Sequence, residues 1–241
     1  MILAPLRSSP RRLAIAGLVA WLAAGCSVPT NPPTPTPTAV PTLPPTAPAY
    51  TLGPSPTGCP TSAPSPMAAG TTATVKFSTN YGDITIKVKA DMGPNAAGAF
   101  VALAQCGYYN DVLFHRIVAG FVIQAGDGTN ARLPNLVPDK MGQGGPSWTI
   151  QDDKVSAKYV RGMLAMANTG AGNSASSQFF IVLADAADTS LTGAKEPYAQ
   201  FGNVTAGMDV VDKIALVPVG GDSGDQALLP VVITGTTVTT P

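Results

Sequence analysis

The sequence has few charged residues, a single histidine and only three cysteines. Asp, Glu, Lys and Arg make up 12% of the 241 residues and cancel to a formal net charge of zero. This balance excludes a nucleic-acid binder that relies on an excess of basic residues. One histidine and the absence of a Cys-x-x-Cys pair leave no ligand set for a zinc or iron–sulfur centre. We therefore expect no metal, no cofactor and no nucleic-acid partner.

The prolines are concentrated in one stretch of the chain. Fourteen of the 24 lie between Pro29 and Pro66, where Asp, Glu, Lys and Arg are all absent. Proline fits neither a helix interior nor a sheet ladder, and the interspersed Thr and Ser residues offer no apolar face to bury. Residues 26–71 are therefore predicted to form a disordered, flexible Pro/Thr-rich tether, and residues 72–241 a single folded domain.

The N-terminus has the features of an export signal. Three arginines precede an apolar run from Leu13 to Ala24, and small residues then lead to Cys26, as in a signal peptide with its cleavage site. The run is well below the ~20 residues of a membrane-spanning helix. A cysteine after small residues resembles the bacterial lipobox, which implies a lipoprotein signal peptide over residues 1–25 and lipidation of Cys26; plain secretion is the alternative. We expect an exported protein, lipid-anchored on the outer face of the bacterial cytoplasmic membrane or at the cell surface.

Two cysteines remain once Cys26 carries lipid. In an exported protein, Cys59 and Cys106 are expected to form one disulfide, which would join the end of the tether to the first helix of the domain. Two unpaired thiols are the alternative.

The rest of the chain alternates short apolar segments with turns. Apolar residues alternate on both sides of residues 80–83, a hairpin signal, and Pro94 opens a helical pattern that Gly107 closes. A second helical pattern covers residues 206–215. Further short apolar segments lie at 113–118, 121–125, 163–167, 179–183 and 231–238. Many short strands with two helices predict an all-β-dominated fold, one closed antiparallel β-barrel.

One predicted loop has a sequence similar to a motif of a different enzyme class. Gly221-Asp222-Ser223-Gly224 looks like the nucleophile segment of trypsin-like serine proteases, but the residues that follow it and the neighbours of His115 differ from that pattern. The loop is interpreted as a turn before the last strand. His115 is expected to be structural, with its ring hydrogen-bonded beneath a strand.

The most informative segment is Phe114-His115-Arg116-Ile117-Val118-Ala119-Gly120-Phe121-Val122-Ile123-Gln124-Ala125-Gly126-Asp127. Together with Met166-Ala167-Asn168 and Ser177-Gln178-Phe179-Phe180-Ile181, it resembles the cyclophilin-type peptidyl-prolyl isomerases. The resemblance extends over nearly all of residues 75–235. It implies an eight-stranded antiparallel barrel with a helix at each end and acceleration of X-Pro isomerisation in proline-containing polypeptides.

The resemblance also assigns roles to individual residues. Arg116 matches the catalytic arginine of the family, and Phe121, Val122, Phe180 and Leu191 match its hydrophobic proline pocket. Gln124, Ala167, Asn168 and Gln178 match positions that hold the substrate backbone or orient the arginine, and the same groove includes Gly142 and Tyr198. These residue types suit the reaction because the barrier is amide resonance, which requires a donor and a pocket but neither a nucleophile nor a general base.

Val122, Ser190 and Tyr198 depart from the family pattern, and the segment from Gly170 to Ser177 is about one residue longer than usual. Val122 replaces the usual Met, and Ser190 stands where animal members have the tryptophan associated with cyclosporin binding, so weak drug sensitivity is expected. We expect a monomer. The alternative to an enzyme is a catalytically weak proline-peptide binding module or folding chaperone on a membrane tether.

Overall fold

The computed structural model describes residues 46–240. The predicted signal peptide and the lipidation site at Cys26 lie outside the described residues. Among the residues that are described, no helix has the length and apolar character needed to cross a membrane.

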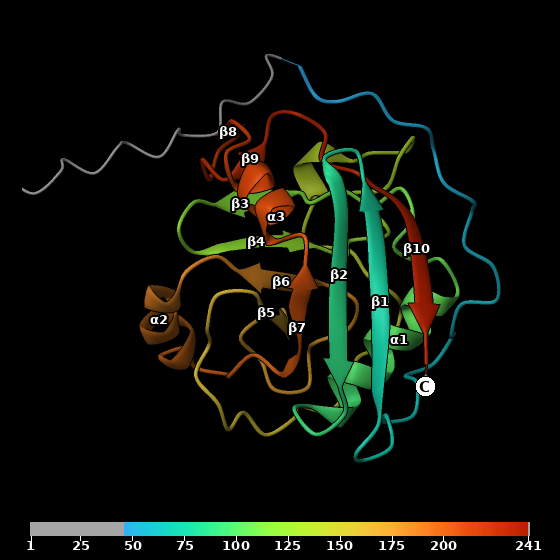
Figure 1. Cartoon of the computed structure of the whole chain (residues 1–241), viewed down its shortest axis with the longest axis vertical. Coiled ribbons are helices and arrows are strands. Elements are labelled where there is room, and N and C mark those ends of the chain that lie inside the picture. The colour runs from blue at the N-terminus through green and yellow to red at the C-terminus, as the bar shows by residue number, and fades with distance from the viewer. Residues whose placement is uncertain (1–45, 241) are drawn as a thin grey trace, which may run out of the picture. The chain divides into compact units, whose positions relative to one another are not determined.

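The domain is dominated by one antiparallel sheet (Figure 1). Its strands follow the order β10-β1-β2-β7-β5-β6-β4-β3-β9-β8. Their bounds are β1 Thr72–Thr79, β2 Gly82–Lys89, β3 Arg116–Val118, β4 Val122–Ala125, β5 Met163–Met166, β6 Phe179–Val182, β7 Gln200–Ala206, β8 Val219–Gly220, β9 Gln226–Ala227 and β10 Ile233–Thr239.

The expected all-β-dominated antiparallel fold with few helices is confirmed, although the sheet of the described residues does not close into an eight-stranded barrel. The described chain has ten strands, with β10 and β8 at the two ends of the sheet. The segment that leads into β3 does bond to the segment that leads into β10: the amide of Asp111 donates to the carbonyl of Ile233 at 2.7 Å, and the amide of Phe114 to that of Val231 at 2.9 Å. These contacts are isolated bridges rather than a ladder, so the two sides are joined without a continuous barrel.

The first two strands follow from their apolar alternation. Val75 and Phe77 of β1 are fully buried, and their partners across the hairpin, Ile86 and Ile84, are fully buried as well. Alternation with period two puts these side chains on one face of the sheet. The predicted hairpin over residues 80–83 is thereby confirmed.

Three α-helices accompany the sheet, one more than expected. They are α1 Pro94–Gln105, α2 Asp188–Thr192 and α3 Met208–Ala215, with 3-10 turns at Pro138–Lys140 and Asp185–Ala187. Helix α2 has only five residues, too few for a helical period to show in the sequence.

Helix α1 begins and ends as its sequence indicates. Pro94 occupies the first turn, where its missing N–H costs nothing. At the other end Gly107 has a φ of +74°, and the amides of Gly107 and Tyr108 donate to the carbonyls of Ala104 and Leu103. This is the Schellman pattern, which satisfies carbonyls that a helix end leaves unpaired.

The core lies between α1 and the sheet and is rich in aromatic rings. Phe100 of α1 meets Phe77, Tyr109, Phe179 and Phe201 with ring centroids 4.7–5.8 Å apart. Such aromatic pairs contribute about 0.5–1.5 kcal/mol beyond their buried area. They fix α1 against the strands that carry the candidate site.

Residues 46–71 need a correction. They were predicted to belong to a flexible tether, but this segment, called the N-terminal arm below, is held against the domain. Its backbone forms specific hydrogen bonds: the Gly53 amide donates to the Asp111 carboxylate at 2.6 Å, and the Met67 amide to the Pro94 carbonyl at 2.9 Å. The composition argument failed because it considered only apolar burial, whereas the arm is fixed through its main-chain polar groups.

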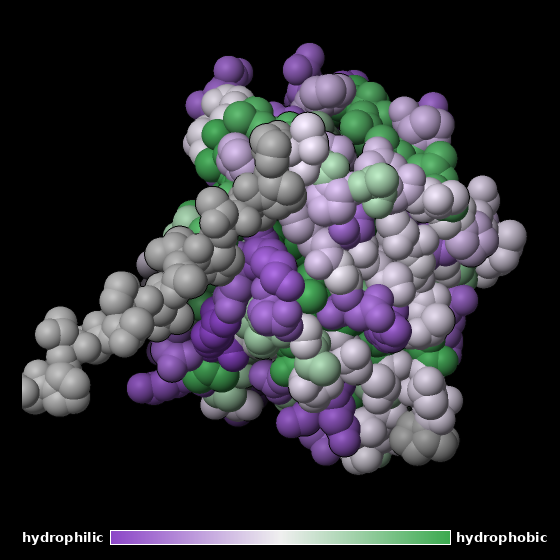
Figure 2. Space-filling view, turned by 45° about the horizontal axis from the view of Figure 1, so that its top comes forward, coloured by the Kyte–Doolittle hydropathy of each residue, from purple (hydrophilic) through white to green (hydrophobic). Residues whose placement is uncertain are grey.

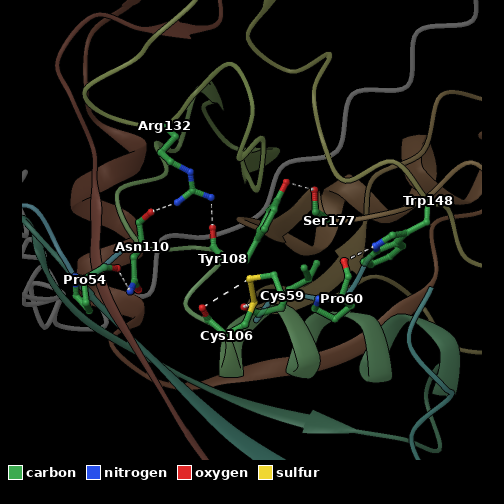
Figure 3. The surroundings of a disulfide bond; sticks show 10 residues. Pro54, Cys59, Pro60, Cys106, Tyr108, Asn110, Arg132, Trp148 and Ser177 are labelled. Carbon is green, nitrogen blue, oxygen red and sulfur yellow. Dashed lines mark hydrogen bonds between the residues drawn. A yellow bond between two sulfur atoms is a disulfide. The ribbon is translucent and has the colours of Figure 1, made fainter. Parts of the chain in front are cut away.

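The predicted disulfide is present at the centre of the arm. Cys59 and Cys106 are bonded, with their Cα atoms 5.1 Å apart. Figure 3 shows this bond at the end of α1, with Pro54 near Asn110 on one side and Pro60 near Trp148 on the other. The Asn110 side chain donates to the Pro54 carbonyl at 2.8 Å, and the Trp148 indole to the Pro60 carbonyl at 3.0 Å. Prolines lack an N–H but still accept through their carbonyls, so a proline-rich arm can be anchored in this way.

The displayed surface carries residues of widely different hydropathy. In the space-filling view of Figure 2, hydrophilic and hydrophobic residues are interspersed over the displayed face. Among the described residues, the large hydrophobic side chains that remain exposed come from several separate segments: Tyr50, Leu52, Val137, Val160, Leu216, Val219 and Leu228.

Candidate active site

The candidate site is built on the antiparallel pair β3 and β4. Arg116 lies opposite Gln124, and Gln124 lies in turn opposite Phe180 of β6. Residues directly opposite each other project from the same face of a sheet, so one face presents these three side chains together. Ile117 and Ile123 project from the other face and are buried in the core, at 1% and 0% exposed. Strand alternation thus separates the site from the core.

A pocket of about 160 Å³ opens on this face. Val122 and Phe180 are almost completely buried in its wall, and the ring of Tyr198 meets that of Phe180 edge-on with centroids 5.2 Å apart. The lining comprises Arg116 and eight of the ten residues predicted to contact substrate: Phe121, Val122, Gln124, Ala167, Asn168, Phe180, Leu191 and Tyr198. The structure therefore brings together residues that are up to 82 positions apart in the sequence, between Arg116 and Tyr198.

The other two predicted residues, Gly142 and Gln178, lie beside the pocket. The Gln178 side-chain amide donates to the carbonyls of Gly142 and Gly144 at 2.9 and 2.8 Å, and its oxygen accepts from the Gln124 amide at 2.9 Å. Gln178 thus connects the loop of Gly142 to the pocket.

Asp127 fixes the same loop and was assigned no role from the sequence. Its carboxylate accepts hydrogen bonds from the backbone amides of Gly142, Gly144, Asn130 and Thr129 at 2.7–3.0 Å. Burial alone would raise the pKa of Asp127, but these bonds lower it below its ordinary value. The carboxylate therefore stays ionised and holds the loop in place. The sequence did contain a hint of this role, because Asp127 is the last residue of the motif segment that contains Arg116.

Asn168 was predicted to hold substrate and is used partly by the protein itself. Its side-chain amide donates to the carbonyls of Glu196 and Pro197 at 3.3 Å each. Tyr198 is anchored through its backbone. The Tyr198 amide donates to the Tyr159 hydroxyl at 3.0 Å, and the Tyr159 hydroxyl donates to the Tyr198 carbonyl at 2.8 Å. Asn168 and Tyr159 thus support the wall of the pocket that Tyr198 forms.

Arg116 is held by a carboxylate that the sequence did not indicate. Its Nε donates to Asp225 Oδ2 at 2.6 Å, while Nη1 lies 3.5 Å from Gln124 Oε1. Partial burial would raise the pKa of Asp225, but hydrogen bonds from Ser223 and Arg116 lower it below its ordinary value. Asp225 is therefore a carboxylate at neutral pH, paired with a permanently charged guanidinium.

His115 is buried, as expected, but its expected hydrogen bond is absent. The residue is 5% exposed, and neither ring nitrogen has a partner among the described residues. Burial lowers the pKa of His115 to about 4, because removal from water disfavours the charged imidazolium. The ring is therefore neutral at neutral pH.

Two larger cavities adjoin the pocket. One of about 520 Å³ shares Arg116 and Gln124 with it, and one of about 350 Å³ shares Gln124, Ala167 and Asn168. The pocket is thus the central part of a longer groove. A small pocket with extensions on two sides fits one ring of an extended polypeptide, with neighbouring residues on either side.

Comparison with known proteins identifies the family. The model for "Cyclophilin type peptidyl-prolyl cis-trans isomerase/CLD" matches residues 74–238, which include all eleven residues of the predicted site. Peptidyl-prolyl cis-trans isomerase B of Escherichia coli is 38% identical over 150 residues, covering 61% of this chain and 86% of that protein. Peptidyl-prolyl cis-trans isomerase-like 2 of Rhizopus delemar is 38% identical over 146 residues, covering 58% of this chain but only 24% of that longer protein.

A solved structure agrees with these relatives. The cyclophilin type peptidyl-prolyl cis-trans isomerase of Cryptosporidium parvum, crystallised in the presence of the dipeptide Ala-Pro, matches with a TM-score of 0.56 and 28% identity, covering 70% of this chain and 99% of that one. The chain belongs to the cyclophilin-type peptidyl-prolyl cis-trans isomerase family.

Proposed function

We propose that this isomerase acts on X-Pro bonds of polypeptides outside the cytoplasm and assists their folding there. The observation that carries the proposal is the position of Arg116, which lines the same pocket as the buried side chains of Val122, Phe180 and Leu191. A hydrophobic wall and a fixed cation are the two elements that the reaction requires.

The chemistry follows from the barrier. Rotation about a peptide bond is opposed by ~18–20 kcal/mol of amide resonance, and an X-Pro bond isomerises unaided over tens to hundreds of seconds. In the twisted state the proline nitrogen regains a lone pair and becomes a better acceptor. A guanidinium donor therefore stabilises the twisted state more than the planar ground state, which is the condition for catalysis.

The surrounding side chains would hold the substrate while the bond rotates. Val122, Phe180 and Leu191 would enclose the proline ring, and Phe121 and Tyr198 would complete the wall. Gln124 and the backbone near Ala167 and Asn168 line the groove beside it, where they would bind the substrate main chain. With one side of the X-Pro bond held in this way, the other side of the bond can rotate.

The location outside the cytoplasm is supported by the sequence and by the disulfide. Cys26 follows an apolar run and small residues, which fits lipid attachment and anchorage on the outer face of the cytoplasmic membrane or at the cell surface. The bond between Cys59 and Cys106 suits an oxidising compartment, because structural disulfides are rare in the reducing cytosol. We propose a monomer, since the exposed large hydrophobic residues come from separate segments.

The decisive measurement is the isomerisation rate of an Ala-Pro peptide in a protease-coupled assay. Removing one preorganised donor from a transition state typically costs 10²–10³ in rate, so Arg116→Ala should lower kcat/KM by about that factor. Arg161→Ala is the matched control, because this arginine pairs with Asp212 at 2.7 Å and does not line the pocket. Equal rates for the wild type and Arg116→Ala would refute the catalytic role. Peptide binding without any acceleration would assign the chain to the proline-peptide binding modules instead.

A further inference from the structure

The contact between Arg116 and Asp225 joins the candidate catalytic residue to a distant loop. The two residues are separated by 109 positions, and the Nε–Oδ2 distance is 2.6 Å. The second carboxylate oxygen, Oδ1, accepts a hydrogen bond from the Ser223 hydroxyl at 2.5 Å. Both oxygens of Asp225 therefore have a defined partner, which restricts rotation of the carboxylate.

The backbone at Asp225 and just after it is bonded to β3 and to the residue that precedes β3. The Ile117 amide donates to the Asp225 carbonyl at 2.8 Å, and the Ala227 amide donates to the His115 carbonyl at 3.3 Å. Arg116 itself pairs with Gln226 across the β3–β9 ladder. The carboxylate is thus carried by a segment whose main chain is bonded to the strand of its partner. This arrangement differs from an ordinary surface ion pair, in which two flexible side chains must be ordered together.

The pair also leaves the reactive part of the arginine available. Within the described residues, Nε bonds to Asp225, Nη1 has only the 3.5 Å contact with Gln124, and Nη2 has no hydrogen-bond partner. A guanidinium is planar and rigid, so holding its Nε–H in one direction fixes the plane in which the two Nη groups lie. The Arg116 side chain is 37% exposed and that of Asp225 23%, so without the carboxylate the arginine would have room to reorient.

We propose that Asp225 is a positioning residue for the isomerase reaction, which orients Arg116 from the β8–β9 loop by accepting a hydrogen bond from Nε. The proposal rests on the proposed catalytic role of Arg116. The positioning role gives a function to the loop whose sequence resembles a protease nucleophile segment. Ser223 orients Asp225, and Asp225 orients Arg116. A misplacement of about 1 Å in a catalytic group can cost up to about a hundredfold in rate.

The test compares substitutions of Asp225 in the full-length chain, purified in detergent. Asp225→Asn keeps the shape of the side chain and removes its charge, and Asp225→Glu keeps the charge. Asp209→Asn is the matched control, because it removes one carboxylate charge from an exposed residue of α3 that pairs with Lys213 at 3.3 Å and lines neither the pocket nor the two cavities beside it. Thermal melting of each variant verifies that it is folded.

Two readouts separate positioning from a merely structural role. Peptide exchange measured by NMR gives kcat and KM separately. Asp225→Asn should lower kcat about tenfold and change KM less than twofold. Asp225→Glu should recover part of the loss, and Asp209→Asn should match the wild type. In protein labelled with ¹⁵N-arginine, the Nε–H resonance of Arg116, assigned by its loss in Arg116→Lys, should shift in Asp225→Asn and stay in place in Asp209→Asn.

The outcomes that overturn the proposal are distinct. An unshifted Arg116 resonance in Asp225→Asn would show that the ion pair does not form. A shifted resonance with kcat within twofold of the wild type would show that the pair forms without serving catalysis. A wild-type protein that is no faster than buffer would refute the catalytic role of Arg116, and the positioning role with it.

Discussion

Replacing both Cys59 and Cys106 by serine should lower the free energy of unfolding of the domain by about 4 kcal/mol. The bond joins residues 47 positions apart, and the loop that it closes contains the second half of the arm, β1, β2 and α1. In the chain-entropy description, a cross-link stabilises the fold by restricting the unfolded chain. For a loop of this length the restriction amounts to about 4 kcal/mol at 25 °C.

The same figure predicts a shift in melting temperature. Unfolding entropy is about 2.1 cal/mol/K per residue, which for the described segment of residues 46–240 gives about 0.4 kcal/mol/K. A loss of about 4 kcal/mol then corresponds to a decrease of about 10 °C in Tm. Calorimetry of the wild type, the double serine variant and a Cys26→Ser control would measure it. The control should melt like the wild type.

Reduction offers an independent measurement of the same quantity. A thiol reductant should bring the wild type to the Tm of the double variant and leave the double variant unchanged. Hydrogen exchange at the amides of Thr57 and Met67, which bond to the carbonyls of Cys106 and Pro94, would report whether the arm remains attached after reduction. If the double serine variant lost less than about 1 kcal/mol of unfolding free energy, the reasoning would be refuted, because closing this loop would then cost the unfolded chain little. Two reactive thiols per denatured, unreduced chain would refute the pairing itself.

Two further predictions concern His115 and Cys26. The pKa of His115 is about 4 in the folded protein and about 6.5 in an unfolded chain. The unfolded state therefore binds the proton more tightly, and the free energy of unfolding decreases as pH falls below about 6.5. In denaturant titrations between pH 8 and pH 5, the wild type should lose about 2 kcal/mol more of its unfolding free energy than His115→Phe. Equal losses for the two proteins would contradict a buried neutral imidazole. Cys26→Ala should release the protein from the membrane fraction of the cells that express it, and a variant that still sediments with membranes would argue against the lipid anchor.

The residues that line the candidate pocket could be selected from the sequence, but the contacts that hold Arg116 in place could not. Arg116, Gln124 and Phe180 were assigned by resemblance, and the register of β3, β4 and β6 explains why they share a face. The pairing of Arg116 with Asp225 could not be predicted, since it depends on how the β8–β9 loop is positioned 109 residues away. The alternation of apolar residues specifies which face of a strand is buried, but it does not specify which loop reaches that strand.

The arm was mispredicted for a different physical reason. Composition measures how much apolar surface a segment can bury, and by that measure residues 46–71 cannot fold. The structure holds them through single backbone hydrogen bonds, such as that from Gly53 to Asp111, and through one covalent bond. Neither contact leaves a periodic trace in the sequence. The contact between the two sides of the sheet near Leu113 and Val232 is likewise an isolated bridge, which leaves no strand pattern in the sequence.

The disulfide also decides how the domain would bear a mechanical load. Tension applied to the N-terminal end of the arm travels along the main chain to Cys59, where the covalent path divides. One branch crosses the sulfur atoms to Cys106 at the end of α1, so the residues between the two cysteines cannot be drawn out into a longer chain. Strands β1 and β2 lie in this closed ring, and pulling from the N-terminus cannot extend them while the bond is oxidised. The pulling force would instead enter the fold at the end of α1, beside the aromatic core that supports the active-site strands.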